Sequence, residues 1–224
     1  MKYFLIFIFI LFNQALNAQN YANKQFALIN YNLEISKEFR KDLKPLNSFI
    51  KSAEVHNKKA ENKLKAILVH HFYYHMKDEL EDYLKISILP VNTHMQKVKY
   101  DAFGYPNEKI NKILRVGDAS HYFKIDISLD SRTKDMKKKN EKLKGDITFP
   151  EIHIKVTVYN NEGMIPIDKW YGKKVTQDSV MVKKRFFRDL VDEKDIPAKP
   201  DEDKEQKSLL NLYYEAVDDL IKKI

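Results

Sequence analysis

Histidines are concentrated in one short segment, which reads His70-His71-Phe72-Tyr73-Tyr74-His75. His71 and His75 are four residues apart, so on a helix both lie on one face and could bind one metal ion. A zinc hydrolase with this spacing also needs a general-base glutamate after the first histidine, but position 72 is phenylalanine. The two histidines also fall in an apolar stripe, where packed histidines are ordinary. The sequence therefore favours a structural role for His71 and His75 over a metal site.

His121 and His153 occur in two neighbouring predicted strands. In each strand apolar and polar side chains alternate, with His121 in the apolar set and His153 in the polar set. Since successive side chains point to opposite faces, we expect these two rings on opposite sides of the sheet. The sequence predicts no site shared by them, and it assigns no cofactor.

Two basic segments could contact an anionic surface or a protein partner. Residues 132–144 hold seven basic residues against two acids, although such charge runs mostly serve solvation. Residues 182–188 mix four basic residues with two phenylalanines, typical of a lipid- or groove-binding segment or of a helix with a basic outer face. Residues 189–205 carry a net charge of −5 and could neutralise residues 182–188. The candidate residues are Lys137, Lys138, Lys139, Lys142, Lys183, Lys184, Arg185 and Arg188.

Trp170 and Tyr171 are adjacent in a predicted strand and could form an exposed aromatic platform for a glycan or a peptide. The alternative is that Trp170 is a core residue whose N–H is paired, which is the commoner role of a single tryptophan. Both residues are kept as candidates for partner binding.

Sequence motifs for catalysis are missing. We find no glycine-rich phosphate loop, no Gly-x-Ser-x-Gly motif and no distinct carboxylate pair. The chain has no cysteine, which excludes thiol catalysis, disulfides and Cys-ligated zinc. We therefore predict that the protein is not an enzyme.

The first 18 residues have the layout of a secretory signal peptide. Lys2 is followed by an apolar run over residues 3–12 and by a polar stretch that ends at Ala18. The run is shorter than the roughly 20 residues of a membrane-spanning helix, so cleavage after Ala18 is favoured over an uncleaved anchor. We expect an exported, non-lipidated protein of the periplasm or the extracellular space, without a later transmembrane segment.

The composition, with 43% hydrophobic and 12% aromatic residues in 224, supports one sizeable core. The formal net charge of +8 suits anionic partners, although export argues against nucleic acid. We expect residues 19–56 to form an N-terminal segment with a weak strand and short helices. Residues 57–224 form the α/β domain, with a lysine-rich insert at 131–146.

Elements of both kinds are predicted in that domain. Period-2 alternation predicts strands from His121 to Leu129, from Ile152 to Tyr159 and around residues 167–175. Apolar stripes predict a long helix over residues 57–84 and a C-terminal helix over 209–224. Pro106 suits the first turn of a further helix that ends near Gly117. The fold class is α+β, with one sheet of about four to five strands and the two longest helices packed on it.

This order of elements resembles small exported α/β modules of the TolB N-terminal domain, CsgG and LpoB type. The similar residues are Gly117–Phe123, at the step into a strand, and Ala216–Leu220 in the last helix. The resemblance spans roughly residues 58–224 and implies an architecture rather than an activity. The lysine-rich insert and the missing lipidation cysteine depart from it.

The sequence thus points to an exported, non-enzymatic binding or accessory protein of the cell envelope that acts through protein–protein contact. Binding of an anionic glycan or a membrane surface through the basic segments is the alternative. A metal-dependent hydrolase at His71 and His75 ranks below both.

Overall fold

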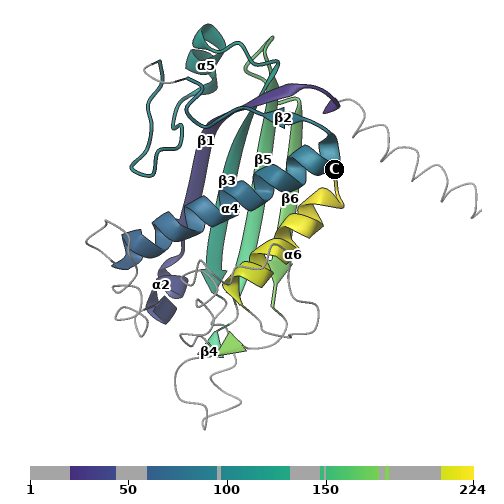
Figure 1. The fold of residues 1–224 in the computed structure, drawn as a ribbon. Helices are drawn as coiled ribbons and strands as arrows, with labels where there is room; N and C mark the ends of the chain where they lie inside the picture. Colours follow the sequence, from purple (N-terminus) through teal and green to yellow (C-terminus); the bar gives the residue numbers. More distant parts are fainter. Residues whose placement is uncertain are drawn as a thin grey trace, which may run out of the picture.

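The computed structural model describes residues 21–43, 60–94, 97–131, 147–148, 150–176, 180–181 and 208–224 (Figure 1). Along the chain the elements are β1 (Gln25–Ile35), α2 (Lys37–Leu43), α4 (Ala60–Leu84), β2 (Ser87–Ile88), α5 (Ile110–Val116), β3 (His121–Ser131), β4 (Ile147–Thr148), β5 (Pro150–Asn160), β6 (Asp168–Val175), β7 (Val180–Met181) and α6 (Leu209–Ile221).

A five-stranded sheet in the order β2-β1-β3-β5-β6 is the centre of the fold. β1 pairs with β2 and β3 in parallel, whereas β3, β5 and β6 pair antiparallel. β4 and β7 form a separate two-stranded sheet. Helices packed on a mixed sheet confirm the predicted α+β class. β1 lies between β2 and β3, so the N-terminal segment contributes a full strand to the same sheet.

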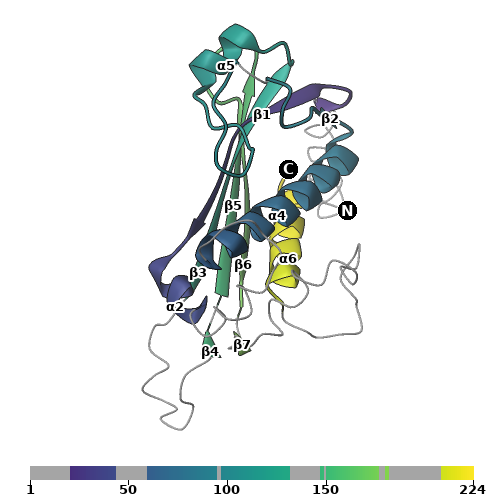
Figure 2. The ribbon, with the colours of Figure 1, turned by 60° about the vertical axis from the view of Figure 1, so that its left-hand side comes forward.

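Alternation in the strands separates a covered face from the other face of the sheet. Ile125, Ile127, Ile154 and Val156 are each at most 1% exposed and belong to the main core. α4 and α6 lie over this face, as the two views show (Figures 1 and 2). The main core is therefore the layer between the sheet and these two helices.

Helix α6 is fixed to both the sheet and α4. Ser208 caps its first turn, because its hydroxyl accepts a hydrogen bond from the backbone N–H of Asn211 at 3.1 Å. The Tyr213 ring stacks on Phe72 of α4, with ring centroids 3.7 Å apart. The Tyr213 hydroxyl also donates to the Phe72 carbonyl at 2.5 Å. These contacts set the position of α6 against α4.

A smaller core covers one end of the opposite face. It is built around α5 and the start of β3, and its buried members are Ala27, Ile29, Val98, Ile113, Ala119 and Tyr122. Figure 1 shows α5 at the upper end of the sheet, above the point where β1 bends. The rest of this face has no covering helix among the described elements.

In the described part of the chain, no helix combines the length and the apolar character needed to cross a membrane.

Candidate functional site

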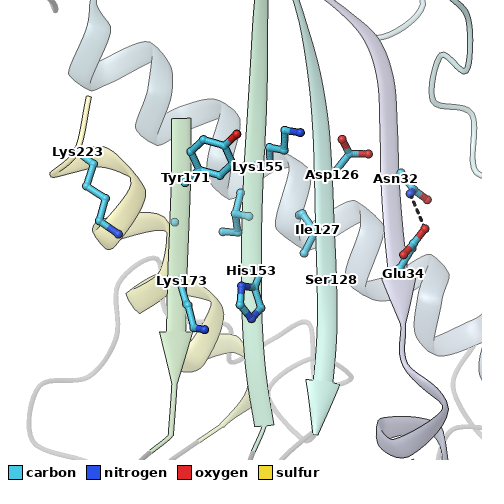
Figure 3. A pocket seen from close by; sticks show the side chains of 12 residues that line it. Asn32, Glu34, Asp126, Ile127, Ser128, His153, Lys155, Tyr171, Lys173 and Lys223 are labelled. Atoms are coloured by element: carbon cyan, nitrogen blue, oxygen red, sulfur yellow. Dashed lines mark hydrogen bonds between the residues drawn. The ribbon is translucent and has the colours of Figure 1, made fainter. Parts of the chain in front are cut away.

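The face of the sheet that α4 and α6 leave uncovered carries the candidate site, which we call the open face. Strand register places its side chains in rows across β1, β3, β5 and β6. One row consists of Asn32, Asp126, Lys155 and Tyr171. The next row consists of Glu34, Ser128, His153 and Lys173. Figure 3 shows these eight side chains on neighbouring strands.

The two rows line a shallow hollow of about 650 Å³. Lys223, in the turn that follows α6, borders it beside β6 (Figure 3). The hollow exists because short polar side chains, such as Ser128, alternate along the strands with the apolar residues of the covered face. Carboxylate, amide, hydroxyl, imidazole, amine and phenol groups therefore meet on one surface.

Charge is distributed unevenly over the open face. Glu34, Asp126 and Asp130 lie on β1 and β3, whereas Lys155 and Lys173 lie on β5 and β6. Each side has one exception. On the acidic side the Lys124 ammonium is 3.1 Å from Asp126, and on the basic side β5 carries the carboxylate of Glu151. The face thus has an acidic half and a basic half.

Glu151 links two groups of the basic half. Its carboxylate lies 2.8 Å from the Lys173 ammonium and also contacts His153 Nε2. Partial burial raises the pKa of the Glu151 carboxyl, but the hydrogen bonds from Lys173 and His153 outweigh burial and hold it below its usual range. Glu151 is therefore an anion that fixes both neighbours in place.

Lys155 and Tyr171 differ from this linked group. The Lys155 ammonium lies 5.9 Å from the centre of the Tyr171 ring, a cation–π distance. Among the described residues it has no carboxylate within ion-pair distance. Tyr171 is 50% exposed, and it is the large hydrophobic residue that the open face presents to solvent. A charged amine and an aromatic ring are thus available for a ligand.

Ser128, His153 and Glu151 are neighbours on this face, and their residue types are those of the nucleophile, base and carboxylate of a catalytic triad. Ser128 and His153 are directly opposite in the β3–β5 register. No hydrogen bond joins their side chains within the described part of the molecule. Backbone N–H groups in paired strands are also used by the ladder, so they cannot serve as an oxyanion hole. The described side chains of Ser128, His153 and Glu151 therefore do not form a catalytic triad.

The candidate metal ligands of α4 lie away from the open face. His75 packs against Tyr214 of α6, with ring centroids 4.1 Å apart, and its Nε2 has no partner among the described residues. His71 belongs to the same helix and is half-buried. No group of three or more side chains suitable for a metal ion occurs in the described ranges. The described residues therefore do not complete a metal site around His71 and His75.

Trp170 and Tyr171 lie on opposite faces of β6. Trp170 is 5% exposed and packs edge-on against Tyr21, at 5.7 Å between ring centroids. The two side chains therefore do not form one platform, and Tyr171 alone is available on the surface. His121 and His153 are also on opposite faces, as expected, with His121 stacked on Phe26 at 4.9 Å. The eight basic candidates of residues 137–142 and 183–188 fall outside the described residues.

Sequence reasoning did not select most of the open face. It missed Asn32, Glu34, Asp126, Ser128, Lys155, Lys173 and Lys223. Alternation does predict polar positions on each strand. The rows, however, depend on the register between paired strands, and the sequence of a single strand does not determine that register.

Three partly or fully buried histidines predict an acid-sensitive fold. Burial lowers the pKa of His75, His94 and His121 below the ordinary value of 6.5. As the pH falls, these histidines are therefore protonated in the unfolded chain before they are protonated in the folded chain. The stability that they contribute is fully present above pH 6.5 and is lost as the pH falls through their lowered folded-state pKa values. Urea unfolding between roughly pH 5 and 7 should show this loss. His75→Gln should flatten the profile, and a stability that rises on acidification would contradict it.

Comparison with known proteins does not identify the chain. No protein-family model and no curated protein matches it. Among solved structures, the hypothetical protein CT253 from Chlamydia trachomatis aligns with a TM-score of 0.41 and 12% identity, over 90% of this chain and 98% of that one. A putative neuraminyllactose-binding hemagglutinin homolog from Helicobacter pylori aligns with a TM-score of 0.41 and 10% identity, over 91% and 88%. Likenesses this distant carry no conclusion about the fold or function of this chain.

Proposed function

We propose that the chain is an exported, non-enzymatic binding protein of the cell envelope that acts by protein–protein contact at the open face. The observation that carries the proposal is the asymmetry of the sheet. One face is closed by α4 and α6, whereas the other presents two rows of polar and charged side chains around a hollow. Export and an envelope location rest on the sequence of residues 1–18 alone.

The chemistry of the open face defines the partner surface that would fit. Tyr171 is its large exposed hydrophobic residue, so an apolar groove or helix would leave the charged rows buried without partners. A polar polypeptide surface fits if it places basic groups opposite Glu34 and Asp126 and acidic groups opposite Lys155 and Lys173. Complementary charge of this kind favours specificity and rapid association.

An anionic glycan is the second candidate, and a specific observation favours it. Lys155, Lys173 and Lys223 line the same hollow as Tyr171. An aromatic ring can stack on a sugar while ammonium groups bind its acidic substituents. The acidic half of the face would remain unused in that case, so we rank this candidate second.

Charge reversal separates the proposed contact from nonspecific binding. Crosslinking of the full-length chain in its native envelope should give a discrete protein adduct that Lys155→Glu reduces at least roughly tenfold. Lys37→Glu, at an exposed lysine at the start of α2, should leave the adduct unchanged. An adduct that survives Lys155→Glu would contradict the proposal. If Lys155→Glu instead abolishes retention on an acidic polysaccharide and no protein adduct forms, the glycan candidate replaces it.

A further inference from the structure

The charge pattern of the open face is complementary to itself. The acidic half lies on β1 and β3, and the basic half lies on β5 and β6 at the same levels of the sheet. We infer that the polypeptide partner of this face is a second copy of the chain, bound about a two-fold axis parallel to the strands. This inference rests on the proposed function, because it names the partner of the same surface.

The direction of the axis follows from the register. The two-fold axis runs parallel to the strands and lies above the sheet, midway between β3 and β5. Rotation about it places β6 of one copy over β1 of the other, and β5 of one copy over β3 of the other. Rows keep their level under this rotation. Asp126 then faces Lys155 of the second copy, and Glu34 faces Lys173 of the second copy. Each of these pairs occurs twice, because the two copies are equivalent.

Neutral groups of the same rows also match under this rotation. Ser128 faces His153 of the second copy, and Asn32 faces Tyr171 of the second copy. A hydroxyl and an imidazole can share a hydrogen bond, and so can an amide and a phenol. The polar side chains of these two rows therefore have partners within the contact. In the next row Asp130 faces Glu151 of the second copy, a carboxylate that Lys173 of its own chain already neutralises.

The other two-fold arrangement is disfavoured. An axis in the plane of the face but across the strands would put the basic half of one copy over the basic half of the other. With this axis between the two rows, Lys155 would lie over His153 and Tyr171 over Lys173, while Asp126 would lie over Ser128 and Glu34 over Asn32. Neither acidic side chain would then face a basic side chain of the second copy, so the ion pairs that favour association would be missing. Electrostatics therefore selects one of the two arrangements.

The area of the open face indicates how strongly two copies should associate. Across the sheet, four strands spaced about 4.8 Å apart span roughly 19 Å. Along each strand, seven residues with a rise of about 3.3 Å span roughly 23 Å. This footprint is smaller than the roughly 800 Å² per partner of a standard stable interface. We therefore expect a dimer that dissociates on dilution and that weakens as salt screens the ion pairs.

Complementation between two variants tests the inference. Within one chain Glu34 and Lys173 are separated by β3 and β5, roughly 14 Å apart, so neither charge can compensate for the other. Glu34→Lys and Lys173→Glu should each weaken self-association roughly tenfold. An equimolar mixture of the two variants should restore it, because both contacts of the mixed dimer then join opposite charges.

Sedimentation of the full-length chain over a concentration series provides the measurement. Wild-type protein should pass from the mass of one copy to that of two, and Lys37→Glu should behave as wild type. A monomer at every concentration, or a mixture that associates no better than its components, overturns the inference. A wild-type monomer whose adduct with a different protein is still abolished by Lys155→Glu overturns this inference alone and leaves the proposed function standing.

Discussion

Gly172→Ala is expected to lower the free energy of unfolding by roughly 3 kcal/mol. A Cβ at this position of β6 would lie 2.3 Å from the carbonyl oxygen of Ala216 and 2.6 Å from the Cβ of Leu220. Both atoms belong to α6, and the carbonyl is part of its backbone, so no side-chain rotation can relieve the contact. The helix would have to move away from the sheet.

The displacement would also reach the edge of the open face. Asp219 of α6 accepts a hydrogen bond from the backbone N–H of Lys173 at 2.8 Å, and this contact depends on the close approach at Gly172. Gly163→Ala is the matched control, since nothing lies within 4 Å of its Cβ position. Chemical denaturation should give a change within about 0.5 kcal/mol for the control. Equal stability of the two variants would contradict the close packing of α6 on β6.

Phe72→Ala is expected to cost about 3–5 kcal/mol, the largest effect of a single substitution that we predict. Phe72 is fully buried, and its ring stacks on Tyr213 with an angle of 6° between the planes. Truncation removes the apolar side chain that joins α4 to α6 and leaves a cavity beneath both helices. The loss of ring stacking adds to the cost.

Tyr83→Ala on the same helix is the control for Phe72→Ala. Tyr83 is 39% exposed, so its truncation should change stability by less than roughly 1 kcal/mol. Both variants can be compared by urea unfolding followed by circular dichroism. Similar losses for the two would show that α4 is not held on the sheet through Phe72.

The strands and their faces could be predicted because alternation is a local property. Ile125 and Ile127 lie on the covered face, and Asp126 and Ser128 lie on the open face, as a period of two requires. The C-terminal helix was predictable for a similar reason, since its apolar stripe is strong. Local pattern therefore gave the α+β class and both layers.

Other features depended on tertiary contacts. Pro106 was expected in the first turn of a helix, but α5 begins at Ile110 and Pro106 forms an isolated bridge with Tyr100. Its fixed φ suits extended backbone as well as it suits a helix start, so the residue type cannot decide between them. The burial of Trp170 could not be predicted from its residue type either, because one face of β6 is buried only where α6 packs on it.

The candidate site was the least predictable part. Glu34 and Lys173 are 139 positions apart in the chain, and they share a row only because β1, β3, β5 and β6 pair in one register. The sequence drew attention to the denser charges of residues 132–144 and 182–188. A surface built from single residues of four strands has no local motif.

Position-specific photo-crosslinking tests the open face most directly. A photoreactive phenylalanine analogue would replace Tyr171 on β6 or, as the control, Tyr74 on α4, since these side chains are 50% and 46% exposed. If the open face is the contact surface, the analogue at position 171 forms a discrete protein adduct in the native envelope and the analogue at position 74 does not. An adduct formed at position 74 but absent at position 171 would contradict the assignment of the open face as the contact surface.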